Sequence, residues 1–341
     1  MSDTQPKHPP AKDMRSILRG RADATMMRGA GIVLAASAIV AMGGALGMWL
    51  GDGPAQDGNN ATPAAPPAAA ADASWLPATE FSPPAVESPL PGWRRFAVAV
   101  PATPDGRPMI AVVIDDVGIV QERSRRVVAL PAPLTLAYLP YAEDLAAQTE
   151  AARSAGHELI VHIPMEPESA DKDTGPNALL TGLDADELRR RLDWNLGRFG
   201  AYVGVSNHMG SRFTRDATSM ELLLAELAER GLLFLDSRTA SGSFGWRLGK
   251  RRGVPVAKRD VFLDNVVEAE AIRARLAELE AVARERGYAV GIGHPHDVTI
   301  DALAEWLSGA AGRGFALVPI SAIVAHRERI ALAARDGAGG E

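Results

Sequence analysis

From Met109 onward the sequence alternates short apolar runs with amphipathic helical patterns, and this alternation restricts the fold more than any other feature. Such alternation is typical of βα units, in which parallel strands form a buried sheet that helices cover. The runs that could form strands are residues 109–114, 134–139, 158–163, 202–205, 232–235, 261–263, 289–292 and 315–318. We therefore expect an α/β domain over residues 106–330, in which seven or eight mostly parallel strands form a closed or nearly closed barrel.

Capping signals mark the beginnings of two of the expected helices. Asp184 with Glu187, and Thr218 with Glu221, match the capping box, in which a small polar residue and a later carboxylate satisfy free backbone N–H groups. We therefore expect helices to begin at Asp184 and at Thr218.

An uncharged apolar segment near the N-terminus predicts a membrane anchor. Residues 29–50 follow Arg28 and precede Asp52, a length sufficient to cross a hydrocarbon core of about 30 Å. Residues 1–28 carry more basic than acidic side chains, so the positive-inside rule keeps them in the cytoplasm. We expect a single-pass protein of the bacterial inner membrane, held through this N-terminal helix, with its domain in the periplasm or outside the cell. A cleaved signal peptide is the alternative, because the segment is rich in alanine and glycine.

Proline and alanine dominate residues 51–105, which we expect to form a semi-extended linker between anchor and domain. Aromatic residues such as Trp93 and Phe96 interrupt its second half. That half therefore either extends into solvent or lies against the domain. Beyond the domain, we expect residues 331–341 to be a flexible tail.

Charge and cysteine content exclude two classes of site. The chain has a net charge of −6 at pH 7, so it lacks the basic excess that is typical of nucleic-acid-binding proteins. It contains no cysteine, so it has neither disulfides nor thiolate metal ligands. Any metal ion must therefore be held by histidine and carboxylate side chains. The sequence identifies no protein partner.

Polar side chains stand where the predicted strands end. Because the carboxyl ends of parallel strands meet at one edge of a sheet or barrel, these side chains should converge on one site. Its candidate residues are Asp115, Asp116, His162, Glu166, Asn207, His208, Ser211, Asp236, Arg238 and His294.

Two adjacent carboxylates follow the first predicted strand. Asp115 and Asp116 should point in different directions, since side chains alternate along a strand, and one could bind a metal while the other acts as a base. A helix cap or a turn is an equally good interpretation of the pair. His162 ends the strand at 158–163, and Glu166 follows it in a turn that prolines stiffen. Imidazole and carboxylate are both ligands that Zn²⁺ accepts.

Two later strand ends each leave alternatives. His208, with a glycine soon after it, is either a third metal ligand or a histidine that is hydrogen-bonded to its own loop. Arg238 either orients Asp115 or holds a carboxylate or acetamido group of a substrate. A purely structural pair of Arg238 with Asp236 fits equally well.

The strings IDDVG, HIPMEP, NHMGS, LDSRT and GHP, in this order, resemble the divergent polysaccharide deacetylase family over residues 108–325. The first part of the set also resembles the motifs of the NodB homology domain. The resemblance implies a distorted, NodB-like (β/α) barrel. It also implies removal of N- or O-acetyl groups from an envelope polysaccharide or oligosaccharide with a divalent metal, Zn²⁺ being the expected ion.

The resemblance implies roles for individual residues. Asp115 would be the general base, Asp116 and His162 would be metal ligands, and His294 would be the general acid that protonates the leaving group. Apart from the resemblance, Arg238 is a candidate catalytic residue, because it could orient Asp115. The residues that would bind substrate or support the site are Glu166, Asn207, Ser211 and Asp236.

The sequence departs from the family pattern at two points. Glu166 stands where the pattern has its second histidine, so either Glu166 or His208 completes the metal site. The arginine-proline-tyrosine motif of the classical enzymes has no match. The alternative function is therefore a catalytically inactive glycan-binding or cell-envelope scaffold protein. A metallophosphatase is a third interpretation, but it would need a second metal and more carboxylates.

Overall fold

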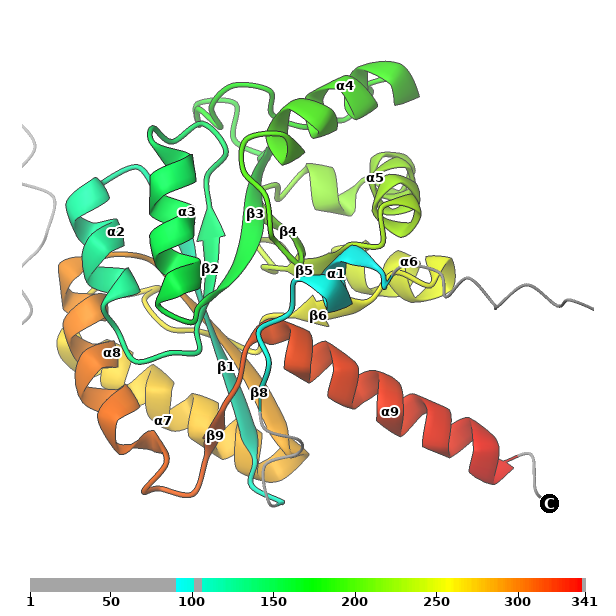
Figure 1. Cartoon of the computed structure of the whole chain (residues 1–341). Coiled ribbons are helices and arrows are strands. Elements are labelled where there is room, and N and C mark those ends of the chain that lie inside the picture. Colours follow the sequence, from blue (N-terminus) through cyan, green and yellow to red (C-terminus); the bar gives the residue numbers. More distant parts are fainter. Residues whose placement is uncertain (1–89, 101–105, 339–341) are drawn as a thin grey trace, which may run out of the picture. The chain divides into compact units, whose positions relative to one another are not determined.

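The computed structural model describes residues 90–100 and 106–338, and every strand in this part of the chain belongs to one parallel sheet (Figure 1). The strands are β1 (Met109–Val117), β2 (Thr135–Tyr138), β3 (Glu158–Met165), β4 (Gly204–Met209), β5 (Leu233–Asp236), β6 (Val256–Lys258), β7 (Val261–Phe262), β8 (Tyr288–Gly293) and β9 (Ala316–Leu317). The helices are α1 (Gly92–Arg95), α2 (Gln121–Val128), α3 (Leu145–Ser154), α4 (Ala185–Leu196), the short η1 (Phe213–Arg215), α5 (Ala217–Glu229), α6 (Gly245–Arg252), α7 (Ala269–Arg286), α8 (Asp297–Ala310) and α9 (Ile320–Ala338).

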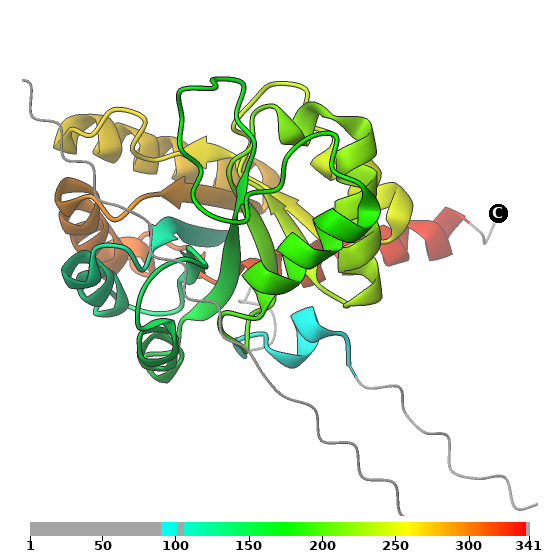
Figure 2. The same cartoon turned by 90° about the horizontal axis from the view of Figure 1, so that it is seen from above.

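The sheet is curled but not closed. Its strand order is β6-β5-β4-β3-β2-β1-β8-β7, so β6 and β7 form its two edges although only Arg259 and Asp260 separate them in the sequence. β9 pairs with the first residues of β1, before β2 joins that strand. The helices from α2 to α8 lie around the outside of the curled sheet (Figure 2). The expected α/β barrel is therefore confirmed in the form of a parallel half-barrel, open between β6 and β7.

Several strands continue beyond the apolar runs that predict them. β1 extends to Val117, β3 to Met165 and β4 to Met209. Polar candidate residues of these strands therefore lie within the sheet, where backbone hydrogen bonds fix their positions. β6 has no counterpart among the predicted runs, because its three residues follow Pro255 and end in a lysine.

Apolar side chains line both faces of the sheet. On one face, alternate residues of β1 such as Ile110 and Val112 pack against the surrounding helices. On the other face, side chains such as Ala111 and Val113 pack against Trp93 and the first half of α9. Trp93 is only 4% exposed, so this part of the expected linker lies against the domain.

Some expected features fall outside the described residues. These are the anchor at residues 29–50 and most of the linker at residues 51–105. Within the described ranges, every helix is either too short or too polar to cross a membrane. α9 continues to Ala338, so residues 331–338 of the expected tail are helical, because their alanine-rich sequence favours a helix.

The starts of α4 and α5 test the capping signals. Asp184 caps α4 as expected, because its side chain accepts a hydrogen bond from the backbone N–H of Glu187 at 2.8 Å. The expected start at Thr218 is wrong, because Asp216 caps α5 by accepting a hydrogen bond from the backbone N–H of Ser219 at 2.8 Å. Asp216 has the extended backbone of an N-cap, whereas Thr218 already lies in the first turn.

Asp216→Ala should lower the free energy of unfolding by about 1 kcal/mol, because it removes the side-chain acceptor of an N-cap. Thr218→Ala is the matched control in the same turn and should change that free energy by less than about 0.5 kcal/mol, since Thr218 is exposed. Denaturant unfolding of the two variants measures the difference. Equal effects of the two substitutions would mean that Asp216 does not cap α5.

Candidate metal centre

A bulge at the end of β1 turns both adjacent carboxylates towards the same histidine. The pairing of β1 with β2 shifts register between Ile114 and Val117, and Asp116 has a φ of 57°. Asp115 Oδ1 lies 3.7 Å from His162 Nδ1, and Asp116 Oδ1 lies 3.2 Å from His162 Nε2. The expectation that the two carboxylates point in different directions is therefore wrong, because a bulge interrupts the two-residue alternation of side chains.

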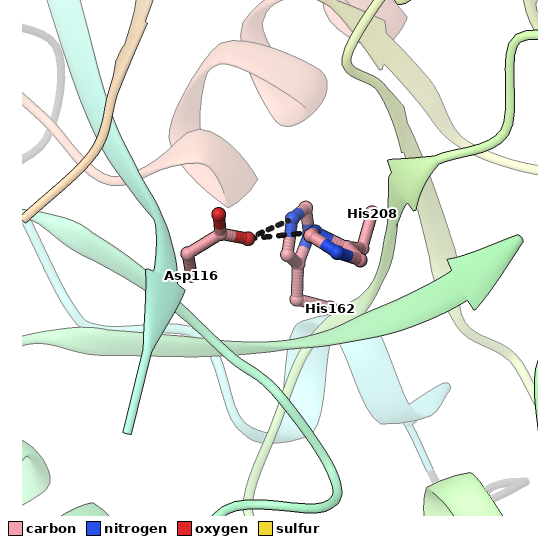
Figure 3. Close-up of side chains that lie close together, drawn as sticks. All are labelled: Asp116, His162 and His208. Atoms are coloured by element: carbon pink, nitrogen blue, oxygen red, sulfur yellow. Dashed lines mark ion pairs between the residues drawn. The ribbon is translucent and has the colours of Figure 1, made fainter. Parts of the chain in front are cut away.

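Asp116, His162 and His208 form a compact cluster (Figure 3). Asp116 Oδ1 lies 2.7 Å from His208 Nδ1, and the centroids of the two imidazole rings are 5.2 Å apart. His208 reaches this position because the register of β3 and β4 pairs it with Pro164. Of the two alternatives for the third position, the structure thus brings His208 rather than Glu166 to the cluster.

Ser206 holds His162 in place. The register of β3 and β4 sets Ser206 directly beside His162, and its Oγ lies 2.7 Å from His162 Nδ1. This contact occupies Nδ1 and leaves Nε2 facing Asp116. Hydrogen bonds of this kind orient the histidines that bind metal ions.

The cluster fits a divalent metal ion. One ligand atom of each side chain lies within 4.8 Å of the others, and the buried Asp116 Oδ1 lies close to both imidazoles without well-aligned hydrogen bonds among the described residues. Burial alone would raise the pKa of Asp116, but His162 and His208 hold it well below its usual range, so the carboxylate is charged. Two imidazoles and one carboxylate are a donor set that Zn²⁺ and similar ions accept, with further positions left for water or substrate.

Asp115 lies beside the cluster without being part of it. The residue is 3% exposed, and its Oδ2 accepts a hydrogen bond from Ser237 Oγ at 3.2 Å. Its Oδ1 is buried and has no hydrogen-bond partner in the described part of the chain. Burial raises the pKa of Asp115, although His162 and His294 act in the opposite direction. A carboxylate with a raised pKa and one uncommitted oxygen is suited to accept a proton.

His294 follows β8 and is held by Asp264. Its Nδ1 lies 3.0 Å from Asp264 Oδ1, and its backbone N–H donates to Asp264 Oδ2 at 2.6 Å. Burial alone would lower the pKa of His294, but the hydrogen bond with Asp264 and the charge of Asp115 raise it to about 9. The ring is therefore protonated at neutral pH, as a general acid must be.

Asp264, His294 and His296 also offer ligand atoms within 4.8 Å of one another. The carboxylate of Asp264 is nevertheless engaged, because Thr299 Oγ1 donates to its Oδ2 at 3.0 Å in addition to the contacts with His294. This geometry is suited to orienting His294 rather than to binding a second metal ion.

Two of the candidate residues hold the segment that follows β3. Glu166 Oε2 accepts hydrogen bonds at 2.6 Å from both the backbone N–H and the hydroxyl of Thr181. Ser211 Oγ accepts a hydrogen bond at 2.9 Å from the backbone N–H of Glu168. Both side chains therefore stabilise a loop, and neither is positioned as a metal ligand.

Asn207 and Asp236 shape the turn after β5. Asn207 Oδ1 accepts a hydrogen bond from the backbone N–H of Ser237 at 2.9 Å, and Asp236 Oδ1 accepts one from the backbone N–H of Arg238 at 2.9 Å. The turn directs Ser237 towards Asp115 and leaves the side chain of Arg238 exposed. Of the alternatives for Arg238, orientation of Asp115 is therefore not supported, because Ser237 contacts that carboxylate instead.

Three residues of the site are absent from the sequence-based predictions. Asp264 directly follows the predicted strand at 261–263, so the strand-end pattern that marks Asp115 could have identified it. Ser206 and Ser237 have no such signal, because their contacts depend on strand register and on the turn after β5.

Known proteins resemble this chain in sequence and in structure. Residues 112–324 match the family model of the divergent polysaccharide deacetylases. The chain is 34% identical over 194 residues to an uncharacterized protein of Haemophilus influenzae, covering 57% of this chain and 69% of that protein. It is 33% identical over 196 residues to the uncharacterized protein YibQ of Escherichia coli, covering 58% of this chain and 61% of YibQ. A crystal structure of an uncharacterized protein of Agrobacterium tumefaciens has a TM-score of 0.67 at 30% identity, covering 69% of this chain and 95% of that one. The match over residues 112–324 shows that this chain belongs to the divergent polysaccharide deacetylase family.

Proposed function

We propose that this protein is a metal-dependent hydrolase that removes acetyl groups from a polysaccharide or oligosaccharide of the cell envelope. The observation that supports this most is the position of Asp115 beside the cluster of Asp116, His162 and His208. A buried base and a set of metal ligands thus share one edge of the sheet. The charge of the same base also acts on His294, whose ring is protonated at neutral pH.

The described residues can carry out both proton transfers of the reaction. Asp116, His162 and His208 would hold the ion, whose chemistry is to polarise a carbonyl and to lower the pKa of water towards 7. Asp115 accepts a proton from the water that adds to the acetyl carbonyl. His294 donates a proton to the nitrogen or oxygen that leaves when the C–N or C–O bond of the acetyl group breaks. The products are acetate and the free amine or hydroxyl of the sugar.

The location of the substrate rests on the sequence alone. The uncharged residues 29–50 and the basic residues before them support a domain that is exported and anchored to the inner membrane. Recovery of the full chain in the cytosol after cell fractionation would contradict this part of the proposal.

Acetate release is the direct test of the activity. The full chain, loaded with Zn²⁺, is incubated with oligomers of N-acetylglucosamine and, separately, with O-acetylated oligosaccharides. We expect acetate to appear and to stop appearing after chelation of the metal. A protein that binds these oligosaccharides without releasing acetate at any metal loading would instead be a catalytically inactive glycan-binding or scaffold protein.

The reaction rate should fall as the pH rises through about 9, because His294 loses its proton there and can no longer act as an acid. The groups that face this ring are Asp264, Asp115, Asp116 and His296. Asp264→Asn removes the charge that holds the proton on His294, so the alkaline limb should move to lower pH. The pH profile of kcat/KM measures the shift. An unchanged alkaline limb would show that another group donates the proton.

A further inference from the structure

Arg238 combines a strained backbone with a side chain that the fold does not use. Its φ is 50°, in the left-handed region that residues other than glycine rarely adopt. The backbone is fixed from two sides, because its N–H donates to Asp236 Oδ1 at 2.9 Å and its carbonyl accepts from Arg259 Nη2 at 2.8 Å. The side chain is exposed and forms no hydrogen bond or ion pair with the described residues. A left-handed backbone at a residue other than glycine, with its side chain left free by the described residues beside the candidate site, indicates a function for that side chain.

Arg259 supplies a second positive charge close to the first. Its Nε donates to the carbonyl of Ser237 at 2.7 Å, its Nη2 donates to that of Arg238, and its guanidinium lies 4.6 Å from the centroid of the Phe262 ring. In the described part of the chain, Nη1 has no partner and no carboxylate forms an ion pair with this arginine. Burial, and then the charge of Arg238, lower the pKa of Arg259, whereas the charges of Asp115 and Asp236 act in the opposite direction. Among the described residues, Nη1 of Arg259 and the guanidinium of Arg238 are thus two unpaired donor groups on neighbouring segments, and a bound anion could accept hydrogen bonds from both.

Contacts of these arginines reach the candidate metal centre from two directions. Ser237, whose carbonyl accepts from Arg259, donates its hydroxyl to Asp115 at 3.2 Å. Phe262, which lies under the same guanidinium, has its ring centroid 5.5 Å from that of His294. The chain of contacts thus spans the open side of the sheet between β6 and β7, next to the general base and the general acid. A group bound there would belong to the sugar that carries the acetyl group or to its neighbour.

We propose that Arg238 and Arg259 bind an acidic group of the substrate, so that the glycan is one whose sugar residues carry carboxylates. A guanidinium presents a planar fork of N–H donors that matches a carboxylate with paired, charge-assisted hydrogen bonds. The inference rests on the proposed function, because it names the substrate class for the same site.

The test compares two tetrasaccharides with the same backbone. One consists of β-1,4-linked N-acetylglucosamine, and in the other alternate residues carry a 3-O-lactyl ether, which adds a carboxylate. Calorimetry measures the binding of each to the Zn²⁺-loaded full chain with the substitution Asp115→Asn, so that turnover does not affect the result. We expect the acidic tetrasaccharide to bind at least about 10-fold more tightly, which corresponds to about 1.4 kcal/mol.

Arg238→Gly should abolish this preference and leave the thermal stability unchanged or higher, because glycine adopts a positive φ without strain. Arg107→Ala is the matched control. This substitution removes an exposed arginine that precedes β1, at the opposite end of the strands. The variant should keep the preference for the acidic tetrasaccharide.

Equal binding of the two tetrasaccharides, or a preference that survives Arg238→Gly, would overturn the inference. Competition by free lactate supports a carboxylate site, whereas competition by inorganic phosphate without competition by lactate would overturn that assignment. A preference for the acidic tetrasaccharide without acetate release from the unsubstituted protein would overturn the proposed function and leave the binding site intact.

Discussion

Zn²⁺ should bind to the purified protein with a stoichiometry of about one, and His208→Ala should weaken that binding by at least about 100-fold. The substitution removes one of three donors and leaves Asp116 with a single imidazole beside it. Ser206→Ala should have an intermediate effect of about 10-fold, because it removes only the contact that orients His162. Glu166→Gln should leave the affinity unchanged, since its carboxylate is hydrogen-bonded within a loop.

Competition with a chromophoric chelator at fixed pH measures these affinities, and far-ultraviolet circular dichroism confirms that each variant is folded. The proposed ligand set requires the loss of Zn²⁺ affinity to be largest for His208→Ala, smaller for Ser206→Ala and absent for Glu166→Gln. If Glu166→Gln abolished Zn²⁺ binding while His208→Ala retained it, the third ligand would be Glu166 and not His208. Failure of the unsubstituted protein to bind Zn²⁺, Co²⁺ or Mn²⁺ would contradict the hydrolase and favour a glycan-binding protein.

Asp115→Asn should lower kcat by about 100- to 10,000-fold while the affinity for Zn²⁺ is retained. Asparagine is similar in size, and its amide oxygen can accept the hydrogen bond that Ser237 donates to Asp115 Oδ2. The local structure should therefore persist. The amide cannot take a proton from water at neutral pH, so the loss should fall on the chemical step and not on KM.

Kinetics and metal content must be measured on the same preparation of this variant. Loss of activity together with loss of the ion would mean that Asp115 is a ligand rather than the base. Activity close to that of the unsubstituted protein would exclude Asp115 as the base, and a different proton acceptor would have to be found near the cluster.

The positions of the metal-cluster residues could be predicted from the sequence because each of them lies at, or within three residues of, the end of a predicted strand. Asp116 and His162 stand where the predicted strands end, and His208 follows another such run. The choice between Glu166 and His208 could not be predicted in this way. It depends on the register of β3 and β4, and on the loop contact with Thr181 that engages Glu166.

Local irregularities of the backbone account for the features that the sequence pattern did not predict. A two-residue alternation cannot represent the bulge that brings Asp115 and Asp116 to the same histidine. The left-handed φ of Arg238 has no glycine or asparagine to signal it, and it depends on contacts with Asp236 and Arg259. β6 is too short for its periodicity to be recognised.

The bulge in β1 places the proposed general base, Asp115, and a proposed metal ligand, Asp116, on neighbouring residues of one strand that is buried almost throughout. The spacing between proton acceptor and ion is then set by consecutive peptide units of the sheet, and no loop contributes to it. Loops around the site are free to diverge in length and composition while the reaction stays the same. Relatives that keep the Asp115–Asp116 pair would share one chemistry and differ in the sugars they accept. Exchange of the segment between β3 and α4 among such relatives should therefore change glycan selectivity without rebuilding the catalytic residues.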